Sequence, residues 1–175
     1  PETHQMVLSG IGDMHLAVLS AKLKARYGVT INLETPKIPY REKITKTVDI
    51  HARHKKQNGG SGQFGDVWIK FGPGEDPGLT FTVSVVGGVV PKNFNPAVEK
   101  GILEGMVKGV AGFPMTYLAA DLHDGSYHPV DSDEMSFKTA AIMAYKQCLE
   151  QAAPVLMEPV GDLDITVPED LVGDV

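Results

Sequence analysis

The sequence predicts a globular protein that mixes β-strands and α-helices, because it shows two kinds of apolar periodicity. Around Ile50, Ile69 and Phe81, apolar residues alternate with polar ones, which is typical of half-buried strands. In other segments apolar residues recur every three or four positions, as on one face of a helix. Of the 175 residues, 42% are hydrophobic and 22% are charged, which is ordinary for a soluble globular protein.

The first segment is expected to form a strand, a helix and a second strand. Residues 4–9 contain a short apolar run, and residues 29–33 are β-branched and short. Between them a helix is expected to begin at Asp13 and to stop at Gly28, a natural C-terminal cap residue. Two prolines in residues 36–39 then indicate a linker. The helix carries its apolar residues on one face: Leu16, Leu19, Leu23 and Tyr27.

The second segment, about residues 38–155, begins with three expected strands. A glycine-rich stretch, residues 59–65, joins the first strand to the second. A further strand is expected over residues 115–122, followed by a polar loop over residues 123–132. The first three strands are marked by alternating apolar residues: Ile44, Val48, Ile50 and Ala52; Val67, Ile69 and Phe71; Phe81, Val83 and Val85.

The first helix of this segment is expected to take Asn95 as its N-cap and Pro96 as its first helical residue. A second row on the helix consists of glycines at a spacing of four, which indicates that the helix closely approaches a sheet. The apolar stripe and the glycine row consist of Val98, Ile102, Met106 and Val110, and of Gly101, Gly105 and Gly109.

The next helix is expected to start at a capping box formed by Asp131 and Glu134 and to run to about Ala152. One face carries mostly small residues, so close packing is implied, and Cys148 on that face is interpreted as a core residue. Beyond it, residues 161–167 alternate like a strand, and residues 168–170 resemble a helix start.

Charge and composition limit the classes of function. The net charge of −6 divides unevenly, with +5 in residues 1–70 (11 basic, 6 acidic) and −10 in residues 121–175 (2 basic, 12 acidic). The basic stretch from Arg53 to Lys56, which includes His54 and Lys55, is either a solvated strand end or a face for a polyanion. With one cysteine, no apolar run of membrane length and no visible signal peptide, a cytoplasmic protein without a cysteine-based zinc site or a disulfide framework is expected.

The glycine-rich stretch is the first candidate site. It lacks the Gly-Lys-Ser/Thr ending of a nucleotide-binding loop and lies between two strands, so neither ATP nor GTP binding is expected here. The alternatives are a flexible hairpin tip and a mobile tip that contacts RNA through amide donors and an aromatic ring. The stretch reads Gln57, Asn58, Gly59, Gly60, Ser61, Gly62, Gln63, Phe64 and Gly65.

The polar loop is the second candidate. Its histidines and carboxylates suit a metal or hydrolytic site, and Ser126, His128 and Asp124 could be drawn as a catalytic triad. Residues this close in sequence rarely reach triad geometry, so a polar loop with an Asp-Gly turn is favoured. The central residues are Asp124, Gly125, Ser126, Tyr127 and His128.

Several motifs, in one order along the whole chain, resemble bacterial translation elongation factor G. They are residues 8–16, Tyr40-Arg41-Glu42, the stretch Gln57 to Gly65, residues 86–91 with 95–101, Asp124 to His128, and residues 156–159 with 168–170.

The resemblance implies an α+β fold with three parts. Residues 38–155 would be the fourth domain, a sandwich like the second domain of ribosomal protein S5. Residues 1–37 would be the C-terminal half of the ferredoxin-like third domain, and residues 156–175 the start of the ferredoxin-like fifth domain. The GTPase domain would lie outside this chain, so GTP and magnesium are implied for the full-length parent, while this fragment is expected to be no enzyme and to hold no cofactor or metal.

The resemblance also implies a ribosomal translocase. In the family, the fourth domain enters the decoding region of the small subunit, and its two tip loops contact the tRNA–mRNA duplex. Gln57 and His128 would lie closest to that duplex, with Arg53, Lys55 and Lys56 as supporting cations. The implied partners of this monomeric protein are the ribosome, rRNA, tRNA and mRNA. Asn58, Ser61 and Pro129 depart from common family residues, so a paralogue that works with ribosome recycling factor stays open.

Overall fold

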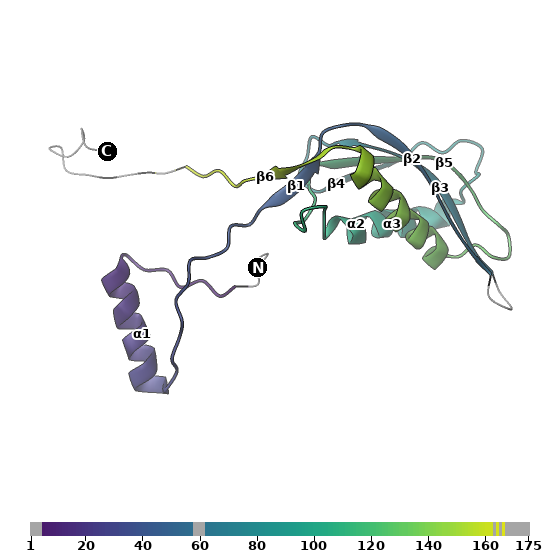
Figure 1. The fold of residues 1–175 in the computed structure, drawn as a ribbon. Coiled ribbons are helices and arrows are strands. Elements are labelled where there is room, and N and C mark those ends of the chain that lie inside the picture. The colour runs from purple at the N-terminus through teal and green to yellow at the C-terminus, as the bar shows by residue number, and fades with distance from the viewer. Residues whose placement is uncertain (1–4, 58–61, 163, 165, 167–175) are drawn as a thin grey trace. The chain divides into compact units, whose positions relative to one another are not determined.

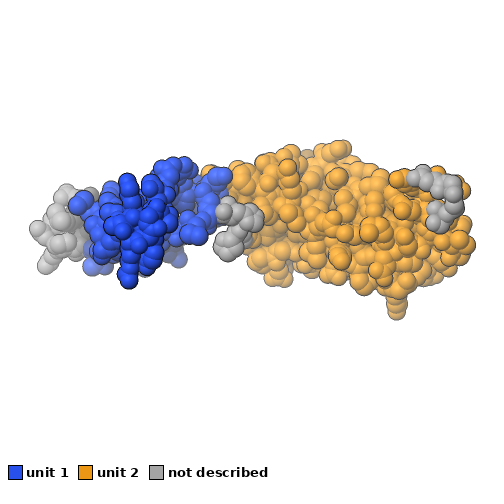
Figure 2. Space-filling view, turned by 90° about the horizontal axis from the view of Figure 1, so that it is seen from below, with its two compact units in different colours: residues 1–39, 159–175 blue, residues 40–158 orange. Residues whose placement is uncertain are grey.

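The computed structural model describes residues 5–57, 62–162, 164 and 166 of the 175-residue chain. The chain divides into two compact units, which Figure 2 shows in different colours. One unit is formed by residues 1–39 and 159–175, and the other by Tyr40–Glu158. The candidate sites all lie in the second unit.

The first unit contains the expected helix and lacks the expected strands. Helix α1 spans Asp13–Tyr27 and ends at Gly28, which is left-handed (φ 69°) and donates its N–H to the Lys24 carbonyl at 3.0 Å. Within the described residues 5–9 and 29–33 no strand forms, so this prediction is wrong. An extended segment becomes a strand only when another segment completes its hydrogen bonds, and these stretches pair with no described strand.

The second unit is built on a four-stranded sheet in the order β2-β3-β5-β4. Its strands are β2 (Val48–Gln57), β3 (Gly62–Pro73), β4 (Leu79–Val83) and β5 (Leu118–Ser126). The β2–β3 and β3–β5 pairs are antiparallel, whereas β4 and β5 are parallel. Helices α2 (Asn95–Met106) and α3 (Glu134–Gln151) cover one face of the sheet (Figure 1). The structure thus confirms a mixed α+β architecture.

A second, two-stranded sheet pairs the two ends of this unit. Strand β1 (Arg41–Ile44) runs antiparallel to β6 (Pro154–Met157). Ile44 and Val48 were expected in one strand, but the chain turns between them, and the backbone N–H groups of Thr45 and Lys46 both donate to the Ala152 carbonyl. The alternation of apolar residues continued across this turn and hid it. The domain boundaries expected at residues 37/38 and 155/156 stay predictions.

The apolar stripes of the two helices face a common core. Val98, Ile102 and Met106 of α2 are buried, whereas Val110 lies beyond the helix and is 65% exposed. The small-residue face of α3 is fully buried, as expected, with Cys148 inside it. Burial raises the pKa of the Cys148 thiol to about 12, which suits a core residue rather than a nucleophile.

The glycine row of α2 contacts a helix and not the sheet, contrary to the prediction. A Cβ on Gly101 would meet the Lys138 carbonyl oxygen, and one on Gly105 would meet the Tyr145 ring, both in α3. The third glycine, Gly109, lies beyond α2 against the carboxylate of Glu42, which is 2% exposed and accepts from a loop backbone N–H. Gly101 and Gly105 therefore allow α2 to approach α3 closely, and Gly109 makes room for the buried carboxylate of Glu42.

Both helix starts that were predicted in the second unit are displaced. A short 3₁₀ helix, η1 (Lys92–Phe94), leads directly into α2, so its cap is Phe94 and not Asn95, which is already helical. The cap of α3 is Asp133, whose side chain accepts from the backbone N–H of Ser136 at 2.7 Å. Asp131, the expected cap, lies two residues earlier, and its carboxylate accepts from the backbone N–H of Gly62. Of the other expected elements, Val85 lies beyond β4, and residues 168–170 fall outside the described residues.

Candidate nucleic-acid interface

The described part of the first candidate stretch is strand. Strands β2 and β3 pair without interruption as far as Gln57 and Gly62, so Gln57 and residues 62–65 belong to a hairpin ladder. Residues 58–61, which complete the predicted loop, lie outside the described residues. The basic residues Arg53, Lys55 and Lys56 lie along β2 and are exposed near the end of this hairpin.

The second candidate stretch was predicted as a loop, and this is wrong for its first part. Strand β5 continues to Ser126, so Asp124 and Gly125 are paired with β3 as well. A bulge between Trp68 and Ile69 shifts the register and permits this continuation. Gly125 lies where a Cβ would collide with the Asp66 carbonyl oxygen. These residues resemble a loop in sequence because most are polar, yet their backbone groups pair with β3.

The turn after β5 is bound to the start of β3. The Phe64 N–H donates to the Asp131 carbonyl at 2.8 Å, and the Ser132 hydroxyl donates to the Phe64 carbonyl at 2.8 Å. The Asp131 carboxylate also accepts from the Gly62 N–H at 3.1 Å, across 69 positions of sequence. These contacts bring the two candidate segments together. One pocket is lined by residues from both: Lys55, Lys56, Gln57, Gly62, Gln63, Phe64, His128 and Asp131.

His128 has a defined ring orientation within this turn. Its Nδ1 accepts from the backbone N–H groups of Val130 (3.3 Å) and Asp131 (3.2 Å), and its own backbone N–H donates to the Ser132 hydroxyl. Nδ1 also lies 3.3 Å from Asp131 Oδ2, which forms an ion pair if the ring is protonated. In the neutral ring the two backbone donors favour the proton on Nε2, which is then a hydrogen-bond donor. The side chain is 51% exposed, and its ring centroid lies 6.4 Å from that of Phe64. The geometry presents an N–H donor to a ligand outside the turn.

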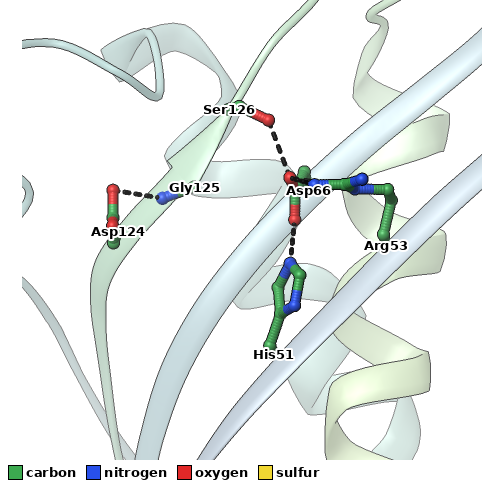
Figure 3. A network of polar contacts seen from close by, with 6 residues as sticks. All are labelled: His51, Arg53, Asp66, Asp124, Gly125 and Ser126. Carbon is green, nitrogen blue, oxygen red and sulfur yellow. Dashed lines mark hydrogen bonds and ion pairs between the residues drawn. The ribbon is translucent and has the colours of Figure 1, made fainter.

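The sequence analysis missed Asp66, which has a central position behind these segments (Figure 3). Its Oδ1 accepts from His51 Nε2 at 2.6 Å. Its Oδ2 accepts from two Arg53 nitrogens, at 2.8 and 3.1 Å, and from the Ser126 hydroxyl at 2.7 Å. The side chain is only 4% exposed. The alternation of strand β3 would have placed a polar residue at position 66, but nothing in the sequence indicated its partners.

Burial and hydrogen bonding act in opposite directions on Asp66. Burial alone raises the pKa of the carboxyl group. The hydrogen bonds from Ser126, Arg53 and His51, together with the charge of Arg53, outweigh burial and hold the pKa below its ordinary value of 3.8. Asp66 is therefore a carboxylate at neutral pH, and the network joins an anion to an arginine cation.

The catalytic-triad alternative finds no support in this geometry. The Ser126 hydroxyl donates to Asp66, and the Asp124 carboxylate accepts from the adjacent Gly125 N–H. The accepting nitrogen of His128 is engaged by its own turn. The three side chains thus have separate partners. Within the residues that the structure describes, no group of three or more histidine, cysteine or acidic side chains could hold a metal ion.

Comparison with known proteins decides the family. Residues 36–153 match the model of elongation factor G, domain IV, and residues 1–35 match the model of elongation factor G, domain III. The chain belongs to the elongation factor G family. Its second unit therefore has the α+β fold of domain IV of that family.

Two relatives of the elongation factor G family show how much of a longer protein this chain resembles. It is 49% identical to an elongation factor G-like protein of Thermotoga maritima, over all of this chain and 26% of that protein. A crystal structure from Thermus thermophilus superposes with a TM-score of 0.80 at 42% identity, over 89% of this chain and 23% of the other. The chain thus spans about a quarter of the length of these relatives. Among its described residues, no helix is long and apolar enough to cross a membrane.

Proposed function

We propose that this chain is the ribosome-contacting part of a translation elongation factor and that the end of its sheet contacts the tRNA–mRNA duplex during translocation. The supporting observation is the direct binding of the His128 turn to the β2–β3 hairpin through Phe64 and Asp131. Two motifs that resemble the tip loops of elongation factor G, far apart in sequence, form one surface here. This surface, from here on the tip, comprises Arg53 to Gln57, residues 62–65 and residues 124–128.

The chemistry of the tip suits the sugar-phosphate backbone of RNA. Exposed Lys55 and Lys56 supply positive charge, and Gln57 and His128 supply N–H donors. The Arg53 guanidinium is exposed as well, but it is paired with the Asp66 carboxylate. Such groups bind phosphate and ribose oxygens, which are the same in every codon. A translocase must move any tRNA, so a contact that does not depend on base sequence fits this task.

We further propose that the energy source lies outside this chain. The described residues of its glycine-rich stretch, Gln57 and residues 62–65, pair between two strands and do not form the strand-to-helix turn of a phosphate-binding loop. GTP and magnesium would bind to the GTPase domain of a cytoplasmic, monomeric parent. The purified 175-residue chain should accordingly show no GTP turnover above that of buffer. Measurable hydrolysis by the purified chain would overturn this assignment.

The deciding experiment is His128→Ala in the full-length parent. We expect slower translocation at an unchanged rate of GTP hydrolysis, because the substitution removes one contact to the moving RNA and leaves the hydrolytic centre intact. The free-energy barrier to translocation should rise by on the order of 1–3 kcal/mol. His123→Ala is the matched control, since that ring binds Asp49 on the sheet face outside the tip pocket. Loss of GTP hydrolysis with unchanged tRNA movement per GTP would contradict the proposal.

A parent specialised for ribosome recycling is the second candidate. Asn58, Ser61 and Pro129 differ from residues common in the main translocase, and the relative from Thermotoga maritima is named elongation factor G-like. The two candidates differ in a direct assay with the full-length protein. A translocase moves mRNA on programmed ribosomes, whereas a recycling factor splits post-termination ribosomes together with ribosome recycling factor.

A further inference from the structure

The Asp66 carboxylate connects three strands just behind the tip. It lies on β3, accepts from His51 and Arg53 on β2, and accepts from Ser126 at the end of β5 (Figure 3). With its side chain 4% exposed, these protein groups take the place of water as its hydrogen-bond donors. Loss of the negative charge would leave a buried site that was built for an anion.

One arm of this network leads to His128. Ser126 is the last residue of β5, and only Tyr127 separates it from His128. The adjacent Gly125 has no side chain that could hold the strand end in place. The hydroxyl–carboxylate bond between Ser126 and Asp66, at 2.7 Å, adds a side-chain contact to the backbone pairing of these two residues at the end of β5.

The other arm leads to the hairpin. The Arg53 guanidinium that binds Asp66 also lies over the ring of Phe64, 5.9 Å from its centroid. Phe64 is the residue whose backbone binds the turn at Asp131 and Ser132. The two arms thus converge on the pair of rings formed by Phe64 and His128.

We propose that Asp66 is a positioning residue that sets the geometry of His128 relative to the β2–β3 hairpin before RNA is bound. This inference deepens the proposed function and rests on it for its biological role. A group held in its binding geometry loses less conformational freedom on binding, so the tip gains affinity for the moving duplex without a contact from Asp66 itself. Asp66 lies in the network behind His128 and does not line the tip pocket.

The geometric claim is testable without the ribosome. In the isotopically labelled 175-residue chain, NMR would follow the nuclear Overhauser effect between the Phe64 and His128 rings and the nitrogen shifts of His128. In Asp66→Asn we expect the ring contact to weaken and His128 to sample both tautomers, while the core signals of Tyr145 stay in place. Ser126→Ala, which removes one arm only, should give a smaller change of the same kind.

The functional claim uses the full-length parent. Asp66→Asn should slow translocation by about tenfold through misplacement of His128, with GTP hydrolysis unchanged. Combined with His128→Ala it should add little, because both changes remove the same contact. Asp49→Asn, an exposed acid on the same strand face as His51, is the matched control and should leave translocation unchanged.

Each outcome has a separate meaning for the two proposals. An intact Phe64–His128 contact in Asp66→Asn, or loss of the Tyr145 core signals with it, would overturn the positioning role. Additive effects of Asp66→Asn and His128→Ala on translocation would also overturn it. If the ring geometry changes as expected but His128→Ala leaves translocation unaffected, the positioning role stands and the proposed function fails.

Discussion

Gly101 of α2 lies directly against the backbone of Lys138 in α3, and a Cβ on Gly101 would come within 2.5 Å of the Lys138 carbonyl oxygen. No real Cβ contact is that short, so this helix crossing requires a residue with no side chain. The next small residue across the interface, Ala141, would lie 2.9 Å from the same Cβ. The contact explains why a helix tolerates glycine here, at a cost of roughly 1 kcal/mol in helix propensity.

Gly101→Ala should therefore destabilise the protein although alanine is the better helix former. We expect the free energy of unfolding to fall by about 1–3 kcal/mol, because α2 must move away from α3. Leu103→Ala on the exposed side of the same helix is the control and should change stability by about 0.5 kcal/mol or less. Urea denaturation measures both. A Gly101→Ala variant as stable as the wild type would show that the helices separate at little cost.

Asp133, and not Asp131, should determine the stability of the α3 start. Asp133→Ala removes the acceptor for the Ser136 N–H and should cost about 1 kcal/mol. Asp133→Asn keeps a side-chain oxygen at the cap and should restore most of that stability. Thermal unfolding of the two variants, compared with the wild type, tests the assignment. The assignment of Asp133 as the cap is wrong if the alanine and asparagine variants unfold at the same temperature.

The Asp66 network should make the protein acid-sensitive in a defined window. Because the pKa of Asp66 is lowered from 3.8 in the folded state, the folded protein holds the carboxylate more favourably than the unfolded chain does. The contribution of the Asp66 carboxylate to the free energy of unfolding is complete above about pH 5 and is lost as the pH falls through the lowered pKa. Asp66→Asn should thus cost about 1.5–3 kcal/mol at neutral pH, with a difference from wild type that shrinks below pH 3.8. A difference that stays constant from neutral pH to well below 3.8 would argue against this account.

Cys148 should be unreactive in the folded protein. Burial raises the pKa of its thiol from 9.0 to about 12, so almost no thiolate is present at mildly alkaline pH, and the side chain is fully buried. A chromogenic disulfide reagent at about pH 8 should label the chain only after urea is added. The contribution of the neutral thiol to stability is complete below pH 9 and should decline as the pH rises towards 12. Rapid labelling of the native chain would show that α3 is loosely packed.

Local signals in the sequence predicted some elements to the residue. Helix α1 begins at Asp13 and stops at the left-handed Gly28, as its apolar spacing and glycine cap indicated. The small-residue face of α3 and the buried Cys148 were also predicted correctly. These features depend on neighbours within a few positions, so the sequence alone carries the information.

Predictions failed where a distant segment supplies the hydrogen-bond partner. Residues 29–33 have the composition of a strand but meet no described strand, and residues 124–126 have the composition of a loop but pair with β3. Both errors have one physical cause, because a strand exists only when its backbone groups are completed from elsewhere in the fold. The order of motifs still indicated the elongation factor G family, because motifs can be compared along the sequence without knowledge of tertiary contacts.

The sequence by itself determined which residues could serve the candidate site: the basic stretch before Gln57, and the His128 segment far along the chain. Only the tertiary structure brought them together, through backbone bonds between Phe64 and the turn that follows β5. It also decided the place of Asp66, a residue that the sequence did not single out. A buried carboxylate is stable only with donors around it, and His51, Arg53 and Ser126 become its donors because three strands pair in one particular register.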